Sequence, residues 1–166
     1  MPEEHRPYRV SYLVSGIGAE RIFAALLDVR RFPEWAAGLK RSRALDVEGR
    51  AETTDLRPGV RLEFTLSAAG ITHEVASTVT AVEPPRRLQW SYVEGASGSG
   101  GWLLEEEGAA TVRMTLWTDY RIKPAWLDKI AHRPFFRRLV EDLIRRSMRR
   151  FEARLRGLGR SAEGQS

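Results

Sequence analysis

His73 is the first candidate for chemistry in this sequence. It lies on the apolar side of the alternating segment 71–81, and imidazole is the side chain that most readily gains and loses a proton near neutral pH. A histidine here could orient a ligand carbonyl or act as a general base. The alternative is a structural histidine, hydrogen-bonded in the core or at the sheet edge, because Glu63 and Glu74 alternate away from it and no paired acid accompanies it.

Tyr92 and Tyr120 occupy apolar-side positions of later strand segments, where a phenol could donate or hold a proton. They belong to a larger set of mainly aromatic and small side chains. Such a set either fills a core or lines a pocket for an apolar ligand, in which tyrosine and tryptophan add a polar contact. The residues predicted to line a ligand site are Trp35, Phe64, His73, Val75, Ser77, Trp90, Tyr92, Trp102, Met114, Tyr120, Leu143, Ser147 and Phe151.

Ser147 interrupts an apolar stripe on the last predicted helix, which begins at Pro134 and ends near Arg156. A leucine would be expected at this position. A small residue that faces a sheet leaves room for a ligand, although a collapsed core would also accept it. A cavity between the sheet and this helix is therefore one of two open alternatives.

Several kinds of site are not predicted. The absence of cysteine excludes disulfides, thiolate zinc sites and cysteine nucleophiles, and the three histidines show no metal-binding spacing. We expect neither a metal nor a cofactor. The glycine-rich stretch 95–101 lacks the residues of a phosphate-binding loop and no helix follows it. We interpret it as a flexible hairpin at the mouth of the pocket, and the polar segment 48–58 as a connection that could act as a lid.

Basic residues are concentrated near the C-terminus. Residues 123–160 hold twelve Lys and Arg against four Asp and Glu, whereas the whole chain carries only +5. A basic helix face could meet RNA, DNA or anionic lipid. The spacing instead favours a solvated face, because acid precedes base at i, i+4 in Glu141–Arg145, Asp142–Arg146 and Glu152–Arg156. Nucleic acid is not an expected partner, since aromatic side chains for base stacking are absent from that face; peripheral membrane contact stays open.

Length and composition predict one soluble domain. A chain of 166 residues can bury a core without disulfides or metals. No apolar run approaches the roughly 20 residues of a membrane span, and the N-terminus is polar rather than like a signal peptide. We expect a cytoplasmic protein with a single domain over residues 1–160 and a disordered tail over 161–166. The oligomeric state is not predicted.

The pattern of elements predicts an α+β fold. Residues 8–15 alternate like a strand, 19–28 have helical spacing, and Pro33 favours a second short helix over 32–37. Helices are expected again over 125–133 and from Pro134 to about Arg156, ended by Gly157 and Gly159. Between them, short connections indicate an antiparallel meander, so the sheet should be curved and have six or seven strands. The further strand segments are 39–47, 60–66, 71–81, 88–92, 102–106 and 112–120.

This order of elements resembles the START-like superfamily, and its polyketide cyclase/dehydrase and lipid-transport members (the SRPBCC group) in particular. The resemblance covers about residues 8–157. It implies a helix-grip fold, in which the sheet wraps a long C-terminal helix; members range from ligand carriers to cyclases to proteins that assist other machines. The segments that carry it are the helix 19–26 leading into Phe32-Pro33-Glu34-Trp35, the strand start Pro58-Gly59-Val60-Arg61-Leu62, the bend Val82–Leu88 and the long terminal helix.

Three functions follow from these observations. The first is binding or carriage of a small hydrophobic or amphipathic ligand, lipid-like or polycyclic aromatic, between sheet and helix. The second is a polyketide cyclase, dehydratase or aromatase without metal, in which His73, Tyr92 or Tyr120 would move protons; the missing acid–base pair weighs against it. The third is an accessory protein that contacts RNA, a ribosome or a membrane surface through the basic helix.

Overall fold

The computed structural model describes residues 7–163, and the side chains through Gly157. Seven strands, three α-helices and one 3-10 helix make up this part of the chain. In chain order they are β1 (Tyr8–Ser15), α1 (Ala19–Leu27), the 3-10 helix η1 (Val29–Glu34), β2 (Leu39–Leu45), β3 (Arg61–Ala68), β4 (Ile71–Glu83), β5 (Arg87–Glu94), β6 (Ala96–Glu107), β7 (Thr111–Ile122), α2 (Ala125–Ala131) and α3 (Pro134–Glu163).

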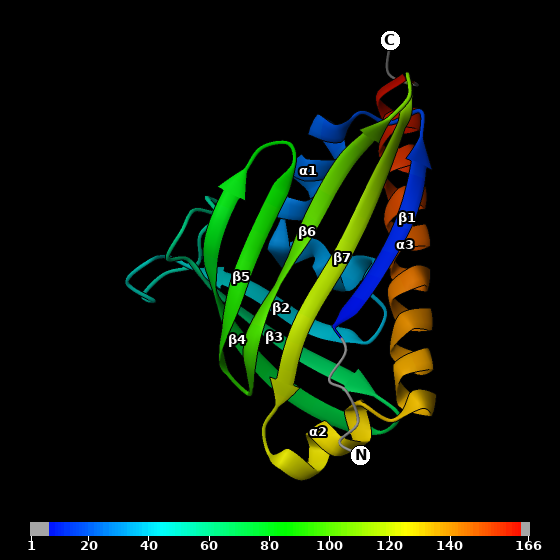
Figure 1. The fold of residues 1–166 in the computed structure, drawn as a ribbon. Helices are drawn as coiled ribbons and strands as arrows, with labels where there is room; N and C mark the ends of the chain where they lie inside the picture. Colours follow the sequence, from blue (N-terminus) through cyan, green and yellow to red (C-terminus); the bar gives the residue numbers. More distant parts are fainter. Residues whose placement is uncertain (1–6, 164–166) are drawn as a thin grey trace.

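The strands form one antiparallel sheet in the order β1-β7-β6-β5-β4-β3-β2. Figure 1 shows the sheet curling around one side, with α3 running beside β1 and α1 behind the strands. Strands β2 to β7 follow one another along the chain, whereas β1 pairs with β7 from Tyr8↔Thr118 to Ser15↔Thr111. The structure confirms the predicted α+β helix-grip fold.

The core lies between the inner face of the sheet and the helices. Leu62, Val79, Leu88 and Met114 mark this inner face, because all four are buried in the main apolar cluster. An aromatic group joins the layers at one point: Trp35, just after η1, packs edge-on against Phe151 of α3, with ring centroids 4.9 Å apart, and against Trp102 of β6 at 6.4 Å. These contacts fill the centre of the molecule.

The helix α3 is buried unevenly along its length. Met148, Phe151 and Leu155, in its second half, are buried in the core. The degree of burial changes at Ser147. Its Oγ donates to the Leu143 carbonyl at 2.7 Å and accepts a hydrogen bond from the Ala37 N–H at 2.8 Å. Apolar side chains before this point are only half-buried: Phe136, Leu139, Val140, Leu143 and Ile144.

Arginines of α3 cover the free edge of β1. A border strand leaves backbone groups without a partner strand, which invites aggregation unless other groups cover them. Of the predicted ion pairs on the helix, Arg156–Glu152 is present at 3.6 Å. The basic side of α3 is thus engaged in part with the sheet. The guanidinium groups donate to carbonyl oxygens as follows: Arg137 to Pro7 at 3.3 Å, Arg145 to Ser11 at 3.4 Å and Arg156 to Ser15 at 2.6 Å.

The hairpin predicted over 95–101 is present between β5 and β6, but the prediction that this glycine-rich stretch is a flexible loop is wrong. Only Gly95 lies between strands, and β6 begins at Ala96. Gly100 and Gly101 pair with both neighbouring strands, and indole rings approach them closely. A Cβ atom at Gly100 would lie 2.9 Å from Nε1 of Trp90, and one at Gly101 would lie 3.0 Å from Nε1 of Trp117. These glycines provide space for tryptophan side chains rather than flexibility.

The prediction that Gly157 and Gly159 end the last helix is also wrong. The helix α3 continues to Glu163. A glycine inside a helix costs only about 1 kcal/mol relative to alanine, so a long helix tolerates it. Residues 161–163 of the expected tail are therefore helical, and residues 164–166 lie outside the described residues.

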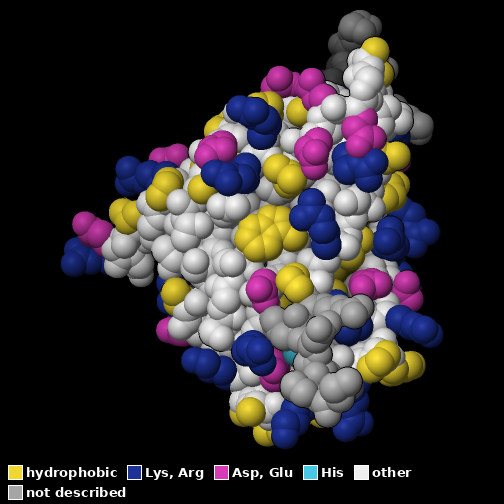
Figure 2. Space-filling view, viewed as in Figure 1, with side chains coloured by type: hydrophobic (Ala, Val, Ile, Leu, Met, Phe, Trp, Pro, Cys, Tyr) yellow, Lys and Arg dark blue, Asp and Glu magenta, His cyan; other side chains and the backbone are white. Residues whose placement is uncertain are grey.

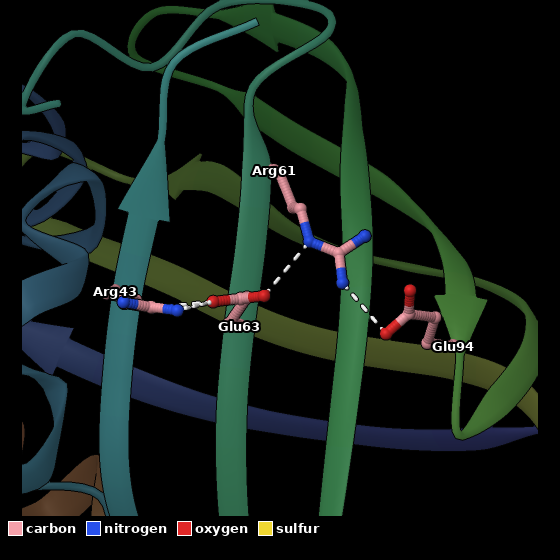
Figure 3. A network of polar contacts seen from close by, with 4 residues as sticks. All are labelled: Arg43, Arg61, Glu63 and Glu94. Atoms are coloured by element: carbon pink, nitrogen blue, oxygen red, sulfur yellow. Dashed lines mark hydrogen bonds and ion pairs between the residues drawn. The ribbon is translucent and has the colours of Figure 1, made fainter. Parts of the chain in front are cut away.

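The outer face of the sheet is polar. Figure 2 shows Lys and Arg side chains interspersed with Asp and Glu side chains over much of the visible surface. Figure 3 shows four of these charges in one network: Arg43 contacts Glu63, Glu63 contacts Arg61 at 3.0 Å, and Arg61 contacts Glu94 at 2.8 Å. The network lies in an outer hollow of about 310 Å³ and connects β2, β3 and β5.

The network lowers the pKa of the Glu63 carboxyl. Partial burial by itself would raise this pKa, but the hydrogen bonds from Arg61 and Arg43 together outweigh that effect. Ionised Glu63 therefore stabilises the folded sheet.

Replacing Ser147 by alanine removes the acceptor for the Ala37 N–H. We expect the free energy of unfolding in urea to fall by about 1–2 kcal/mol, because a partly buried donor loses its partner. Ser97→Ala is the matched control, since Ser97 is half-buried and its hydroxyl makes no hydrogen bond within residues 7–163. Equal losses in the two variants would contradict the role of Ser147.

Glu63→Gln should destabilise the protein at neutral pH and not in acid. Because the folded-state pKa of Glu63 lies below its ordinary value of 4.5, the stabilisation is complete above that value and is lost as the pH falls through the folded-state pKa. We expect a loss of about 0.5–1 kcal/mol at neutral pH, from urea unfolding at several pH values. The exposed Glu106→Gln variant should track the wild type throughout; a Glu63→Gln deficit that persists in acid would refute this account.

Candidate functional site

Coverage of the inner face decreases along β3. The register places Leu62, Phe64 and Leu66 on the same face, opposite Ser77, Val75 and His73 of β4. Leu62 is 2% exposed and Phe64 is half-buried, whereas Leu66 is 42% exposed. This end of β3 is close to the first half of α3, because a Cβ atom at Gly38 would lie 3.0 Å from the Ser67 carbonyl oxygen and 3.8 Å from Cδ1 of Leu143. The less covered ends of the sheet and the helix therefore meet.

Three hydroxyl groups lie further along the inner face, beginning with Ser77, which is opposite Leu62 at the covered end of β3. Ser77 pairs in register with Tyr92 of the next strand, and the Tyr92 hydroxyl is hydrogen-bonded to Thr118 Oγ1 of β7 at 2.7 Å. Strand β6 lies between β5 and β7, and Gly100 is the residue opposite Thr118.

Ser77 is the unusual member of this group. The residue is 0% exposed, and within the described residues its Oγ has no hydrogen-bond partner. A buried hydroxyl without a partner costs about 1–3 kcal/mol, which most folded proteins avoid. The inner face therefore offers an unsatisfied polar group in an otherwise apolar and aromatic setting.

Stacked tyrosines continue the inner face toward α2. The ring of Tyr120 is 5.6 Å from that of Tyr8 in a stacked arrangement and 6.3 Å from that of Tyr92, edge-on. The Tyr8 hydroxyl donates to the Ala131 carbonyl at 3.0 Å, and the His132 ring lies 5.5 Å from Tyr120. The end of α2 thus covers the tyrosines.

Burial sets the protonation state of the tyrosines. It raises the pKa of the Tyr92 phenol, and it also raises the pKa of the Tyr120 phenol, where the neighbouring Tyr8 acts in the same direction. Both phenols are neutral at physiological pH. They can donate hydrogen bonds to a ligand, but they are poor general bases.

The structure separates the predicted ligand-site residues into two groups. Trp35, Trp102, Met114 and Phe151 are fully buried and pack within the core. Val75, Ser77 and Ser147 are also buried, and Ser147 is bonded to backbone groups as described above. The half-buried residues on or opposite the inner face are Phe64, His73, Trp90, Tyr92, Tyr120 and Leu143.

His73 lies apart from the tyrosines. Its Nε2 is 2.8 Å from the Gly95 carbonyl oxygen, so the ring connects β4 to the turn before β6. Glu63 and Glu74, as expected, belong to the other face: they take register positions that alternate with those of Phe64 and His73. No carboxylate is bonded to His73 in the described residues.

Sequence reasoning missed Tyr8, Thr118 and His132. Tyr8 and Thr118 are register partners more than one hundred residues apart, so no local pattern joins them. His132 follows α2 and contacts Asp128 at 3.1 Å. Thr118 and Tyr120 are two residues apart and therefore share one face of their strand. This spacing was the one signal that could have placed Thr118 on the inner face.

Two general features of residues 7–163 bear on the site. They contain no group of three or more acidic or histidine side chains arranged to hold a metal ion. None of their helices is long and apolar enough to cross a membrane.

Comparison with known proteins gives the family. The profile of the family described as "Polyketide cyclase / dehydrase and lipid transport" matches residues 10–156. The chain belongs to this family. That description covers both enzymes and carriers, so membership in the polyketide cyclase and lipid transport family fixes the fold and leaves the activity open. No curated protein matches the chain in sequence.

Solved structures with this fold are distant in sequence. TTHA0849 from Thermus thermophilus is 14% identical, with a TM-score of 0.72 over 92% of this chain and 99% of that one. The Zhui aromatase/cyclase from Streptomyces sp. R1128 is 15% identical, with 0.67 over 91% and 94%. A START superfamily protein from Mycobacterium smegmatis is 14% identical, with 0.66 over 92% and 98%. At these identities the likeness shows the fold alone.

The hydrogen bond between Tyr92 and Thr118 should appear in a double-mutant cycle. Tyr92→Phe or Thr118→Val alone leaves one hydroxyl without its partner, so each should lower the free energy of unfolding by about 1 kcal/mol. The double variant should lose less than the sum of the two, with a coupling of about 0.5–1 kcal/mol. Strict additivity in urea denaturation would show that the two hydroxyls do not interact.

Proposed function

We propose that this protein binds a small hydrophobic or amphipathic ligand between the inner face of its sheet and the first half of α3. The observation that carries the proposal is Ser77 Oγ, which is fully buried and unpartnered within the described residues. A polar atom of a ligand would satisfy this hydroxyl and remove the cost of leaving it unpaired.

The surroundings of Ser77 define the chemistry of such a ligand. Phe64, Trp90 and Tyr92 supply flat apolar surface, and Leu66 of β3 remains 42% exposed on the same face. Across from them, Leu143 of α3 is half-buried. A lipid-like or polycyclic aromatic molecule with one hydroxyl or carbonyl group suits these contacts. The predicted ligand-site residues include no Asp, Glu, Lys or Arg, so a highly charged ligand would be desolvated without compensation.

A second function, that of a cyclase or dehydratase, is favoured by one observation. Tyr92 and Tyr120 present neutral phenols on the inner face, because burial raises the pKa of both. Neutral donors can polarise a ligand carbonyl, and a confined pocket can hold a reactive chain in a folded shape. His73 would then be the candidate that moves a proton. Carriage of a ligand needs none of these steps, and we therefore place it first.

The extent of the ligand-binding domain and the cellular compartment are also part of the proposal. We infer one ligand-binding domain over residues 1–160, because the buried residues of the helices and of the sheet form a single apolar cluster. A chain without cysteine suits the reducing cytoplasm.

Ligand binding can be tested with the purified protein. Native mass spectrometry should show a retained small molecule, and thermal unfolding with fatty acids, sterols and polycyclic aromatics should show stabilisation by at least one class. Ser77→Ala should weaken binding by about five- to tenfold, because it removes one hydrogen bond worth about 1 kcal/mol, while the ligand-free protein keeps or gains stability. Ser91→Ala is the matched control, since Ser91 alternates with Tyr92 onto the other face of β5.

Two outcomes would contradict the proposal. One is the absence of both a retained molecule and any stabilising compound. The other is an equal loss of affinity in Ser77→Ala and Ser91→Ala. Loss of water from a bound polyketide-like chain, detected as a mass change, would instead support the enzyme; turnover unchanged in His73→Ala, Tyr92→Phe and Tyr120→Phe would remove these residues from it.

A further inference from the structure

Two large aromatic side chains project from the corner between α2 and α3. Trp126 is 61% exposed and Phe135 is 80% exposed, although aromatic side chains of this size are usually covered. The fold does not use them: α2 buries Leu127 and Ala131 instead, and neither aromatic ring contacts another ring within residues 7–163. Their exposure points to contact with something outside the chain.

Exposed cations surround these rings. On α2, Lys129 follows Trp126 by three residues, so the two share one side of the helix, and Arg133 lies in the turn between α2 and α3. On α3, Arg138 follows Phe135 by three. Together with Lys123, the residues Trp126, Lys129, Arg133, Phe135 and Arg138 form what we call the aromatic–basic corner.

Among the described residues, no carboxylate neutralises the charge of this corner. Its four cations form no ion pair with any other described residue. The one acidic residue of α2, Asp128, turns inward: its Oδ1 accepts the Ile122 N–H at 2.8 Å and lies 3.1 Å from His132 Nε2. At the lower end of Figure 2, where α2 lies, hydrophobic and basic side chains stand side by side. The corner therefore combines apolar area with positive charge.

The shape of the corner selects among partners. Figure 1 shows α2 projecting beyond the end of the sheet, so the aromatic–basic corner is convex rather than a groove. A peptide or a nucleic-acid base needs a concave site to bury its own surface. Lipids, in contrast, can rearrange around a protruding aromatic ring. Tryptophan favours the headgroup level of a membrane, and Lys and Arg add attraction to anionic lipids. We propose that the aromatic–basic corner docks this protein on the surface of an anionic lipid bilayer.

This role goes beyond ligand binding and does not require it. Ser77 lies on the inner face and is fully buried, so Ser77→Ala should leave membrane docking unchanged. Failure of one proposal is thereby distinguishable from failure of the other.

Vesicle sedimentation tests the docking. The full chain should sediment with vesicles of equimolar phosphatidylcholine and phosphatidylserine, less with phosphatidylcholine alone, and less again as salt is added. Trp126→Ala with Phe135→Ala, and Lys129→Glu with Arg133→Glu, should each weaken the binding by about tenfold or more. All four side chains are exposed, and circular dichroism should show unchanged melting of these variants.

Matched controls separate the corner from general surface properties. Arg86→Glu with Arg150→Glu changes the same net charge at exposed sites elsewhere, and Leu13→Ala removes an apolar side chain that is 49% exposed on β1. Neither should alter vesicle binding by more than about twofold. Equal effects of the corner variants and these controls would overturn the proposal.

Tryptophan fluorescence shows whether the aromatic–basic corner is the part of the protein that faces the bilayer. All five tryptophans lie within residues 7–163 and Trp126 alone among them is exposed, so bromine-labelled lipid chains should quench its emission on docking. Trp126→Phe should abolish most of the quenching while it retains most of the binding. Absence of sedimentation at low salt, sedimentation without quenching, or stronger dependence on the corner for RNA than for vesicles would each overturn the proposal.

Discussion

The attachment of α3 to the interior at Ser147 governs the rest of this structure. The helix buries Met148, Phe151 and Leu155 after that point, while the apolar residues before it stay half-buried. The hydrogen bond from the Ala37 N–H to Ser147 Oγ lies at this boundary. A leucine at this position would bury more apolar area but would leave the Ala37 donor without its partner. The serine thus exchanges hydrophobic contact for a fixed position of the helix.

Fixing α3 in this way divides the interior into two parts. In one part, Trp35, Trp102 and Phe151 fill the space and hold the layers together. In the other, Ser77, Tyr92 and Tyr120 face inward, and Leu66 at the end of β3 stays 42% exposed. The packing of the core therefore depends on the first part, whereas the ligand binding that we propose would depend on the second.

The basic residues near the C-terminus illustrate how one feature can have several uses. Arg145 and Arg156 cover the carbonyl groups of β1, and Arg137 lies 4.1 Å above the ring of Tyr8 while it donates to Pro7. These contacts attach the helix along the border strand of the described sheet. The cations of the aromatic–basic corner make no such contacts within residues 7–163, and they lie at the end where Trp126 and Phe135 are exposed. A uniform basic pattern in the sequence thus acquires different environments in the fold.

The sequence by itself determined the elements and their order, because period-two and helical spacing depend only on which face of each segment is apolar. It placed β1 at residues 8–15, the hairpins of the sheet, the long terminal helix and the side of each strand on which Ser77, Tyr92 and Tyr120 lie. It could not show that Gly100 makes room for Trp90, that Tyr8 lies opposite Thr118, or that Ser77 lacks a partner among the described residues. Those facts arise from contacts between residues far apart in the chain, and only the folding of β1 onto β7 and of α3 into the sheet brings such residues together.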